Sequence, residues 1–294
     1  MITRPRRSVL YMPGSNTRAI DKARTLPVDG VILDLEDAVA PDAKAQARAQ
    51  VVEAVKQGGF GSREVMIRIN GLDTPWSSDD LTAAAAAGPH AIVVPKISTV
   101  EQLEMIGQRL LDMKADHKTR IWAMIETPAA IFNILALASE AHDSETRLAG
   151  FIMGTNDLAK ETRARQVPGR APMVSWLATC VLAARAHGIE ILDGVYNDLG
   201  NAEGFVAECA QARDMGFDGK TLIHPNQIAP CNTVFSPGDD EVAQARAMIA
   251  AFDRPENRDK GVVQIDGRMV ERMHAEMARR TVMIAEAKIG RAHV

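Results

Sequence analysis

Apolar residues in this chain form short, nearly continuous runs that alternate with longer, helix-like stretches. Near-continuous apolar runs are typical of parallel strands that are buried on both faces. The predicted strands are residues 8–12, 30–35, 65–70, 91–96, 121–127, 148–155, 189–194 and 219–224. The predicted helices between them are residues 16–25, 41–57, 77–87, 99–113, 128–139, 172–187 and 201–215.

This alternation predicts an α/β protein with a (β/α)8 (TIM) barrel, whose usual size is about 250 residues. An open, doubly wound sheet is the alternative fold. A nucleotide-binding sheet of that kind favours a G-x-G-x-x-G turn after its first strand. The corresponding segment here, PGSNTRA (13–19), lacks that spacing, so the barrel is preferred.

The pattern changes after residue 225. The predicted elements there are a loop at 226–240 with Pro230 and Pro237, a helix at 239–253, a polar turn at 254–261, a hairpin at 262–270 and a helix at 271–289. Asp266-Gly267 is a favoured tight-turn pair for that hairpin. We therefore expect a catalytic barrel domain at 1–228. The C-terminal helical and hairpin extension at 229–294 would pack on the barrel or on a neighbouring subunit.

The composition of the chain argues against a nucleic-acid or membrane partner. The 294 residues carry a net charge of −4 with a pI near 6.0, and 4% are aromatic, which argues against a nucleic-acid partner. The three cysteines are scattered and fit a reducing cytoplasm. The chain lacks a signal-peptide core and an apolar run of membrane-spanning length. We expect a cytoplasmic protein with no membrane partner.

Polar residues collect at the predicted strand ends, where barrel enzymes place their chemistry. They are Asp34, Glu36, Asp37, Arg68, Asn70, Lys96, Glu126, Thr155, Asn156, Asp157, Asp193 and His224. Several carboxylates in one small site need a cation, and oxygen ligands without a His/Cys cluster favour Mg²⁺ or Mn²⁺. Glu126 and Asp157, on neighbouring strands, are the predicted metal pair. The planar fork of Arg68 is predicted to grip a substrate carboxylate at two points.

Structural roles are the alternatives for these residues. Glu126 could instead form a plain ion pair with Arg68, and Asp157 could be the N-cap of a helix that starts at Leu158. Asp34 and Asp193 are expected to tie strands to loops.

Eight sequence blocks occur in an order that matches a known family. They are RSVLYMPGSN (7–16), DLEDAVAPDAKAQAR (34–48), IRINGLDTPW (67–76), VVPKI (93–97), IETPAAI (125–131), GTNDLAK (154–160), LIHPNQI (222–228) and IDGRMVE (265–271). The chain resembles the HpcH/HpaI aldolase/citrate lyase family. The most similar branch is the citrate lyase β-subunit-like group, which includes malyl-CoA and citramalyl-CoA lyases.

The resemblance implies an Mg²⁺-dependent TIM-barrel enzyme, a carbon–carbon lyase that is often a homotrimer or a hexamer. The implied reaction cleaves a 3-hydroxy-carboxyacyl-CoA into acetyl-CoA and a 2-keto acid. It also implies Glu126 and Asp157 as metal ligands and Arg68 as the holder of the keto-acid carboxylate. Glu36 and Asp37 would form an acidic pair near the reacting centre. The residues implied along the coenzyme A nucleotide path are Arg7, Tyr11, Lys22 and Lys44.

One block departs from the family pattern. Related CoA lyases carry an Asp two residues after the Met of the C-terminal motif, and it acts as general acid/base in a neighbouring subunit's site. This chain has Glu271 at that position, so its substrate or its type of reaction could differ from those of the related lyases. An acyl-CoA thioesterase and a citrate lyase β subunit that works only in a multi-subunit enzyme are the alternatives. A CoA-independent pyruvate aldolase is disfavoured, because its relatives lack the extension.

Overall fold

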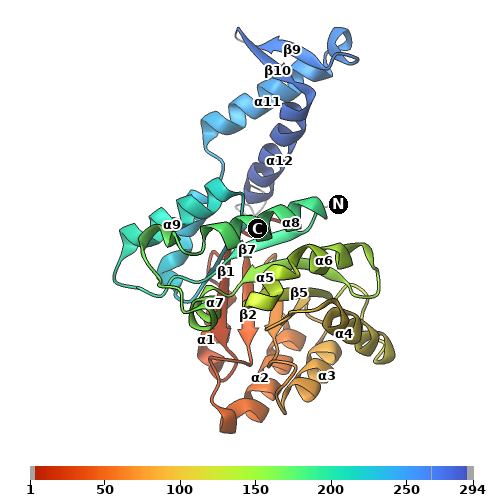
Figure 1. The fold of residues 1–294 in the computed structure, drawn as a ribbon, viewed down its shortest axis with the longest axis vertical. Helices are drawn as coiled ribbons and strands as arrows, with labels where there is room; N and C mark the ends of the chain where they lie inside the picture. The colour runs from red at the N-terminus through yellow and green to blue at the C-terminus, as the bar shows by residue number, and fades with distance from the viewer. Residues whose placement is uncertain (1–3, 266, 290–294) are drawn as a thin grey trace. The chain divides into compact units, whose positions relative to one another are not determined.

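The computed structural model describes residues 4–265 and 267–289. Its first compact unit, Arg6–Thr233, contains eight parallel strands that close into a barrel in chain order, β1 to β8 (Figure 1). They are β1 (Ser8–Pro13), β2 (Gly30–Asp34), β3 (Glu64–Arg68), β4 (Ala91–Val94), β5 (Arg120–Ile125), β6 (Leu148–Met153), β7 (Glu190–Asp193) and β8 (Gly219–Leu222). The predicted (β/α)8 barrel is confirmed, and the open sheet is wrong because β1 pairs with β8.

The barrel interior is filled by alternate residues of the strands. Its buried core consists of Val9, Ile32, Met66, Ala91, Val93, Trp122, Met124, Ile152 and Leu192. Successive residues of a strand point to opposite faces, so residues two positions apart share one face. The residues two positions beyond Val9, Ile32, Met66 and Met124 are Tyr11, Asp34, Arg68 and Glu126. The barrel therefore carries polar side chains above an apolar floor, near the carboxyl ends of its strands.

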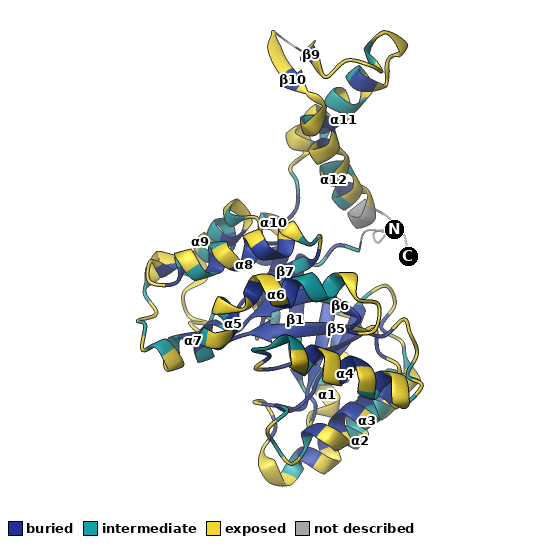
Figure 2. Ribbon diagram, turned by 45° about the vertical axis from the view of Figure 1, so that its right-hand side comes forward, coloured by how far each residue is buried: buried dark blue, intermediate teal, exposed yellow. Residues whose placement is uncertain are grey.

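Helices surround the barrel, and Figure 2 shows buried strands inside helices with exposed outer sides. They are α1 (Thr17–Ala23), α2 (Lys44–Gln57), α3 (Ser77–Ala87), α4 (Val100–Asp112), α5 (Pro128–Phe132), α6 (Ile134–Ser139), α7 (Thr155–Thr162), α8 (Val174–Ala186) and α9 (Ala202–Met215). The helix predicted at 128–139 is divided at Asn133 into α5 and α6. A 3-10 turn at Pro41–Ala43 precedes α2.

The second compact unit combines the start of the chain, up to Pro5, with the chain from Val234 onward. It contains α11 (Asp239–Asp253), the antiparallel hairpin of β9 (Val262–Ile265) and β10 (Arg268–Glu271), and α12 (Arg272–Ile289). Its small core consists of Phe252, Val263, Val270 and Ala275. The predicted turn residue Asp266 lies outside the described residues, and Gly267 has a left-handed φ of 79°.

Two further observations concern the helices. The loop predicted at 226–240 is wrong in its first half, because α10 (Ile228–Val234) forms there. Pro230 is its third residue, where a missing N–H breaks no hydrogen bond within the helix. None of the helices in the described ranges has the length and apolar character that a membrane crossing requires.

Candidate active site

A cavity of about 280 Å³ opens at the carboxyl ends of the strands; we call it the mouth. It is lined by Tyr11, Asp34, Asp37, Ala38, Arg68, Met124, Glu126, Met153, Gly154, Thr155, Asn156, Asp157, Val195, Asn197, Thr221 and Ile223. Five of the predicted site residues therefore share one cavity, namely Tyr11, Asp37, Arg68, Glu126 and Asp157.

Asp34 organises the side of the mouth formed by β2 and β3. One carboxylate oxygen accepts hydrogen bonds from the backbone N–H of Glu36 (2.9 Å) and from Arg68 Nε (2.6 Å). The other accepts from the backbone N–H of Ala38 (3.1 Å) and from Arg68 Nη2 (2.7 Å). Burial alone would raise the pKa of Asp34, but Arg68 and these hydrogen bonds hold it below its usual 3.8. Asp34 thus has the structural role expected for it.

Arg68 is buried and surrounded by acceptors. Its guanidinium lies 4.7 Å from the centre of the Tyr11 ring, and Nη1 is 2.9 Å from Glu36 Oε2 and 3.4 Å from Asp37 Oδ2. The predicted two-point grip on a substrate needs a correction, because Asp34 occupies the edge formed by Nε and Nη2. Nη1 is engaged as well, by Glu36 and by the exposed Asp37 at the rim. Asp37 is exposed at the rim, whereas Glu36 is largely buried.

Two buried carboxylates at the mouth are short of neighbouring positive charge: Glu126, which lines the cavity, and Glu36, which does not line it but binds Arg68 beside it. Burial raises the pKa of Glu126 to about 8, and the charges of Glu36 and Asp157 add to the rise. Burial also raises the pKa of Glu36 to about 7 although Arg68 opposes it. One oxygen of Glu126 accepts a hydrogen bond from the backbone N–H of Lys96 (2.8 Å), a residue with a left-handed φ of 56°. A bound cation would stabilise the charged form of these groups.

Gly154, directly after β6, leaves the space that Glu126 occupies. A Cβ at Gly154 would lie closer than 3.0 Å to both Cβ and Oε2 of Glu126. The following helix, α7, begins at Thr155 with Gly154 as its N-cap, so the interpretation of Asp157 as an N-cap is wrong. Asp157 lies in the first turn of α7 and lines the mouth.

The donor set limits what the mouth can hold. Within the described part of the chain, no three His, Cys, Asp or Glu side chains are grouped so that they could bind a metal ion. Mg²⁺ commonly takes one or two protein carboxylates and completes its six oxygen ligands with water and substrate. Glu126 and Asp157 fit that requirement, and the high pKa of Glu126 marks a site that favours an added positive charge.

Two lysines predicted on the nucleotide path have different surroundings. Lys44 is buried, and Nζ donates to the backbone oxygens of Leu35 (2.8 Å) and Glu36 (2.7 Å). It therefore fixes the loop after β2 and is not free for a phosphate. Lys22 is exposed on α1 and does not line the mouth.

Arg7 lies away from the mouth. It precedes β1, so it is at the amino-terminal end of the barrel, and both arms of its guanidinium bind Asp29 at 2.8 and 2.9 Å. The structure does not bring Arg7 to the strand ends that form the mouth, because a residue before a strand lies at the opposite end from a residue after it.

Asp193 also lies outside the mouth lining. Asp193 points to the outside of the barrel, where it is fully buried and binds Arg170 (2.7 Å) and Lys220 (2.7 Å). This is the structural role expected for it. Glu271 is the last residue of β10 in the second unit and is exposed.

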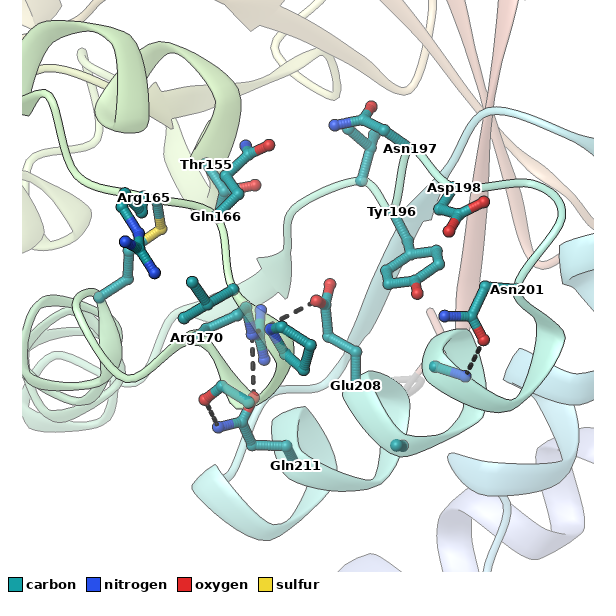
Figure 3. A pocket seen from close by; sticks show the side chains of 17 residues that line it. Thr155, Arg165, Gln166, Arg170, Tyr196, Asn197, Asp198, Asn201, Glu208 and Gln211 are labelled. Atoms are coloured by element: carbon teal, nitrogen blue, oxygen red, sulfur yellow. Dashed lines mark hydrogen bonds and ion pairs between the residues drawn. The ribbon is translucent and has the colours of Figure 1, made fainter.

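A larger cavity of about 490 Å³, which we call the loop pocket, was not predicted from the sequence. It lies between the segments 163–173 and 194–201 and helix α9, and Figure 3 shows its lining. It shares Thr155, Val195 and Asn197 with the mouth. No signal in the sequence marks it, because two of its walls come from segments about 30 residues apart.

Comparisons with known proteins show what this chain is similar to. The family model described as HpcH/HpaI aldolase/citrate lyase matches residues 7–225. A "(3S)-malyl-CoA thioesterase" of Cereibacter sphaeroides is 47% identical, over 96% of this chain and 95% of the relative. A "Citrate lyase subunit beta" of Escherichia coli is 32% identical, over 97% and 94%. Among solved structures, protein CitE of Mycobacterium tuberculosis in complex with magnesium, acetoacetate and coenzyme A has a TM-score of 0.73. It is 27% identical, and the match covers 95% of this chain and 97% of that protein.

Proposed function

Because this chain belongs to the HpcH/HpaI aldolase/citrate lyase family, we propose that it is a divalent-metal-dependent enzyme acting on a coenzyme A thioester. The substrate class is a 3-hydroxy-carboxyacyl-CoA of the malyl-CoA type, and the reaction is hydrolysis of the thioester. The observation that carries the proposal is the convergence of Arg68, Glu126 and Asp157 on the mouth, with Glu36 bound to Arg68. The relative with 47% identity, which is named as a malyl-CoA thioesterase, supports hydrolysis over carbon–carbon cleavage.

Mg²⁺ would be held by Glu126 and Asp157. When bound, the ion neutralises these carboxylates and polarises the substrate oxygens that reach it. The space at Gly154 and the hydrogen bond from the Lys96 backbone keep Glu126 in place for this role. The related CitE protein, solved in complex with magnesium and coenzyme A, supports the same choice of ion.

Glu36 is suited to moving the proton of the attacking water. Its pKa of about 7 places it near the optimum for a general base in neutral solution. In the proposed step the water oxygen bonds to the thioester carbonyl carbon while Glu36 takes the proton. The C–S bond then breaks, Glu36 returns the proton to the leaving sulfur, and coenzyme A departs as the free thiol. Arg68 Nη1 orients the Glu36 carboxylate, and in the proposed complex the free carboxylate of the substrate replaces the exposed Asp37 as its second acceptor.

Carbon–carbon cleavage, the reaction expected first from the sequence, is the second candidate. The citrate lyase β relatives at 32% identity favour it. Cleavage needs a base for the C3 hydroxyl and an acid that protonates the thioester enolate. Glu36 could serve as the base, and Glu271 is the proposed acid.

Product analysis separates the two reactions. The purified chain is incubated with (3S)-malyl-CoA and Mg²⁺, and the products are resolved by chromatography. Hydrolysis yields free coenzyme A and malate in equal amounts, whereas cleavage yields acetyl-CoA and glyoxylate. EDTA should abolish turnover and excess Mg²⁺ should restore it. No turnover with Mg²⁺ present would overturn the proposal for the isolated chain and favour a subunit that needs partners.

The extension and the assembly belong to the same proposal. We propose that the predicted region 229–294 completes the site of a neighbouring copy in a trimer or hexamer, with Glu271 as the contributed residue. Mixing subunits of Glu36→Gln with subunits of Glu271→Gln should then restore part of the activity that each variant lacks. A monomer in light scattering, or no recovery on mixing, would contradict shared sites.

A further inference from the structure

The two proposed metal ligands are held in different ways. Glu126 is buried, and the backbone N–H of Lys96 binds its carboxylate directly. Asp157 is half-buried, and no described residue donates a hydrogen bond to its carboxylate. The position of Asp157 therefore depends on the backbone of the first turn of α7. A metal ligand has to be held within about 0.5 Å of its working geometry, so that turn needs an anchor.

The residue next to Asp157 is tied to two separate loops. Asn156 Oδ1 accepts hydrogen bonds from Asn197 Nδ2 (2.7 Å) and Gln166 Nε2 (2.8 Å), and Asn156 Nδ2 donates to Asn197 Oδ1 (3.3 Å). We call these three side chains the amide cluster. Gln166 and Asn197 also line the loop pocket, as Figure 3 shows, so the cluster lies at the boundary between the two cavities.

The cluster joins three chain segments around the start of α7. Gln166 belongs to the segment before α8, and Asn197 belongs to the segment after β7. Gly194, directly after β7, also packs tightly against this turn, because a Cβ at Gly194 would lie 2.7 Å from Thr155 Oγ1. Packing at Thr155 and hydrogen bonds at Asn156 thus fix the two residues that precede Asp157.

We propose that Asn156 and Asn197 are positioning residues for the divalent ion, and that they act by holding the first turn of α7. This inference rests on the proposed role of Asp157 as a metal ligand. The cluster is exposed, so its hydrogen bonds are individually weak, and their loss should weaken ion affinity roughly three- to tenfold, which corresponds to about 0.7–1.4 kcal/mol. The effect should be on affinity for the ion and not on folding.

The test measures Mn²⁺ binding by electron paramagnetic resonance on the full-length protein. Asn156→Ala and Asn197→Ala should each weaken Mn²⁺ binding about three- to tenfold, and the double variant should be no weaker than Asn156→Ala alone. Gln108→Ala is the matched control, because Gln108 makes one exposed hydrogen bond, to Asp112 on α4 (2.8 Å). It should bind Mn²⁺ as the wild type does. Thermal unfolding midpoints of the cluster variants should stay close to that of the control.

Asp157→Asn separates this inference from the proposed function. If Asp157→Asn binds Mn²⁺ like the wild type, the metal site itself is wrong. If Asp157→Asn loses the ion while Asn156→Ala keeps wild-type affinity, the positioning role alone is overturned. Additive losses in the double variant, or a lowered midpoint that accounts for the loss of binding, would also refute it.

Discussion

Replacing Gly154 by alanine perturbs the proposed metal site with a single methyl group. The backbone of Gly154, with φ −98° and ψ 73°, is not in the left-handed region, so the substitution acts through space and not through backbone strain. The new Cβ would lie closer than 3.0 Å to the Cβ and Oε2 atoms of Glu126. The clash involves the base of the Glu126 side chain, which cannot rotate away.

The size of the effect follows from the contact. Carbon atoms in favourable contact are about 3.5–4.0 Å apart, so Glu126 or the start of α7 has to move by about 0.5 Å or more. Overpacking of this kind costs about 1–3 kcal/mol of folding stability. A displacement that approaches 1 Å at a reacting centre costs on the order of a hundredfold in rate. We expect Gly154→Ala to fold, to bind Mn²⁺ at least about tenfold more weakly and to lose about a hundredfold in kcat/KM.

The assay compares Mn²⁺ affinity, thioester turnover and urea unfolding for Gly154→Ala and a control. Gly261→Ala is the matched control, because a Cβ there meets nothing within 4 Å. It should resemble the wild type in all three measurements. Wild-type Mn²⁺ affinity and turnover in Gly154→Ala would refute the assignment of Glu126 as a metal ligand.

Three further variants test the charges around the barrel. Arg68→Lys keeps the charge but loses the paired hydrogen bonds to Asp34, so kcat/KM should fall by about 10²–10³; a fall of less than threefold would contradict its role. Glu36→Gln should lose about 10²–10⁴ in kcat/KM and abolish the rise of wild-type activity as the pH passes through about 7, whereas a retained rise would exclude Glu36 as the base. Asp193→Asn leaves Lys220 short of a buried partner and should cost about 3–5 kcal/mol in urea unfolding at neutral pH. Burial raises the pKa of Asp193, but Lys220 and Arg170 outweigh burial and hold that pKa below 3.8. The greater stability of the wild type over Asp193→Asn should therefore persist above pH 3.8 and shrink as the pH falls further. A stability difference that does not change with pH would contradict the assignment.

The strands were predictable because burial on both faces leaves a simple pattern. All eight predicted runs coincide with strands of the barrel to within a few residues at either end. Because parallel strands end on the same side of a barrel, their order in the chain is enough to place Asp34, Arg68 and Glu126 at one rim. The start of α7 was harder to predict, because Thr155 and Asn156 follow an apolar run directly and Gly154, the N-cap, has no side chain that could mark a helix start.

Side-chain pairing within the site could not be predicted in the same way. Nothing local in the sequence indicates that Asp34 takes two donors of Arg68, since the two residues are 34 positions apart. Lys44, the first residue of α2, reaches back to carbonyl groups eight and nine positions earlier, a pairing that local sequence does not indicate. Arg7 illustrates a different error, because a resemblance in sequence order does not say at which end of the barrel a side chain lies.

The loop that follows β2 has irregular backbone but a dense set of internal partners. The carboxylate of Asp34 binds the amides of Glu36 and Ala38, while the ammonium group of Lys44 binds the oxygens of Leu35 and Glu36. Amide hydrogens in such a segment should exchange with deuterium as slowly as those of a regular helix. The proposed general base would then be in place before any substrate arrives, and little ordering entropy would be lost on binding.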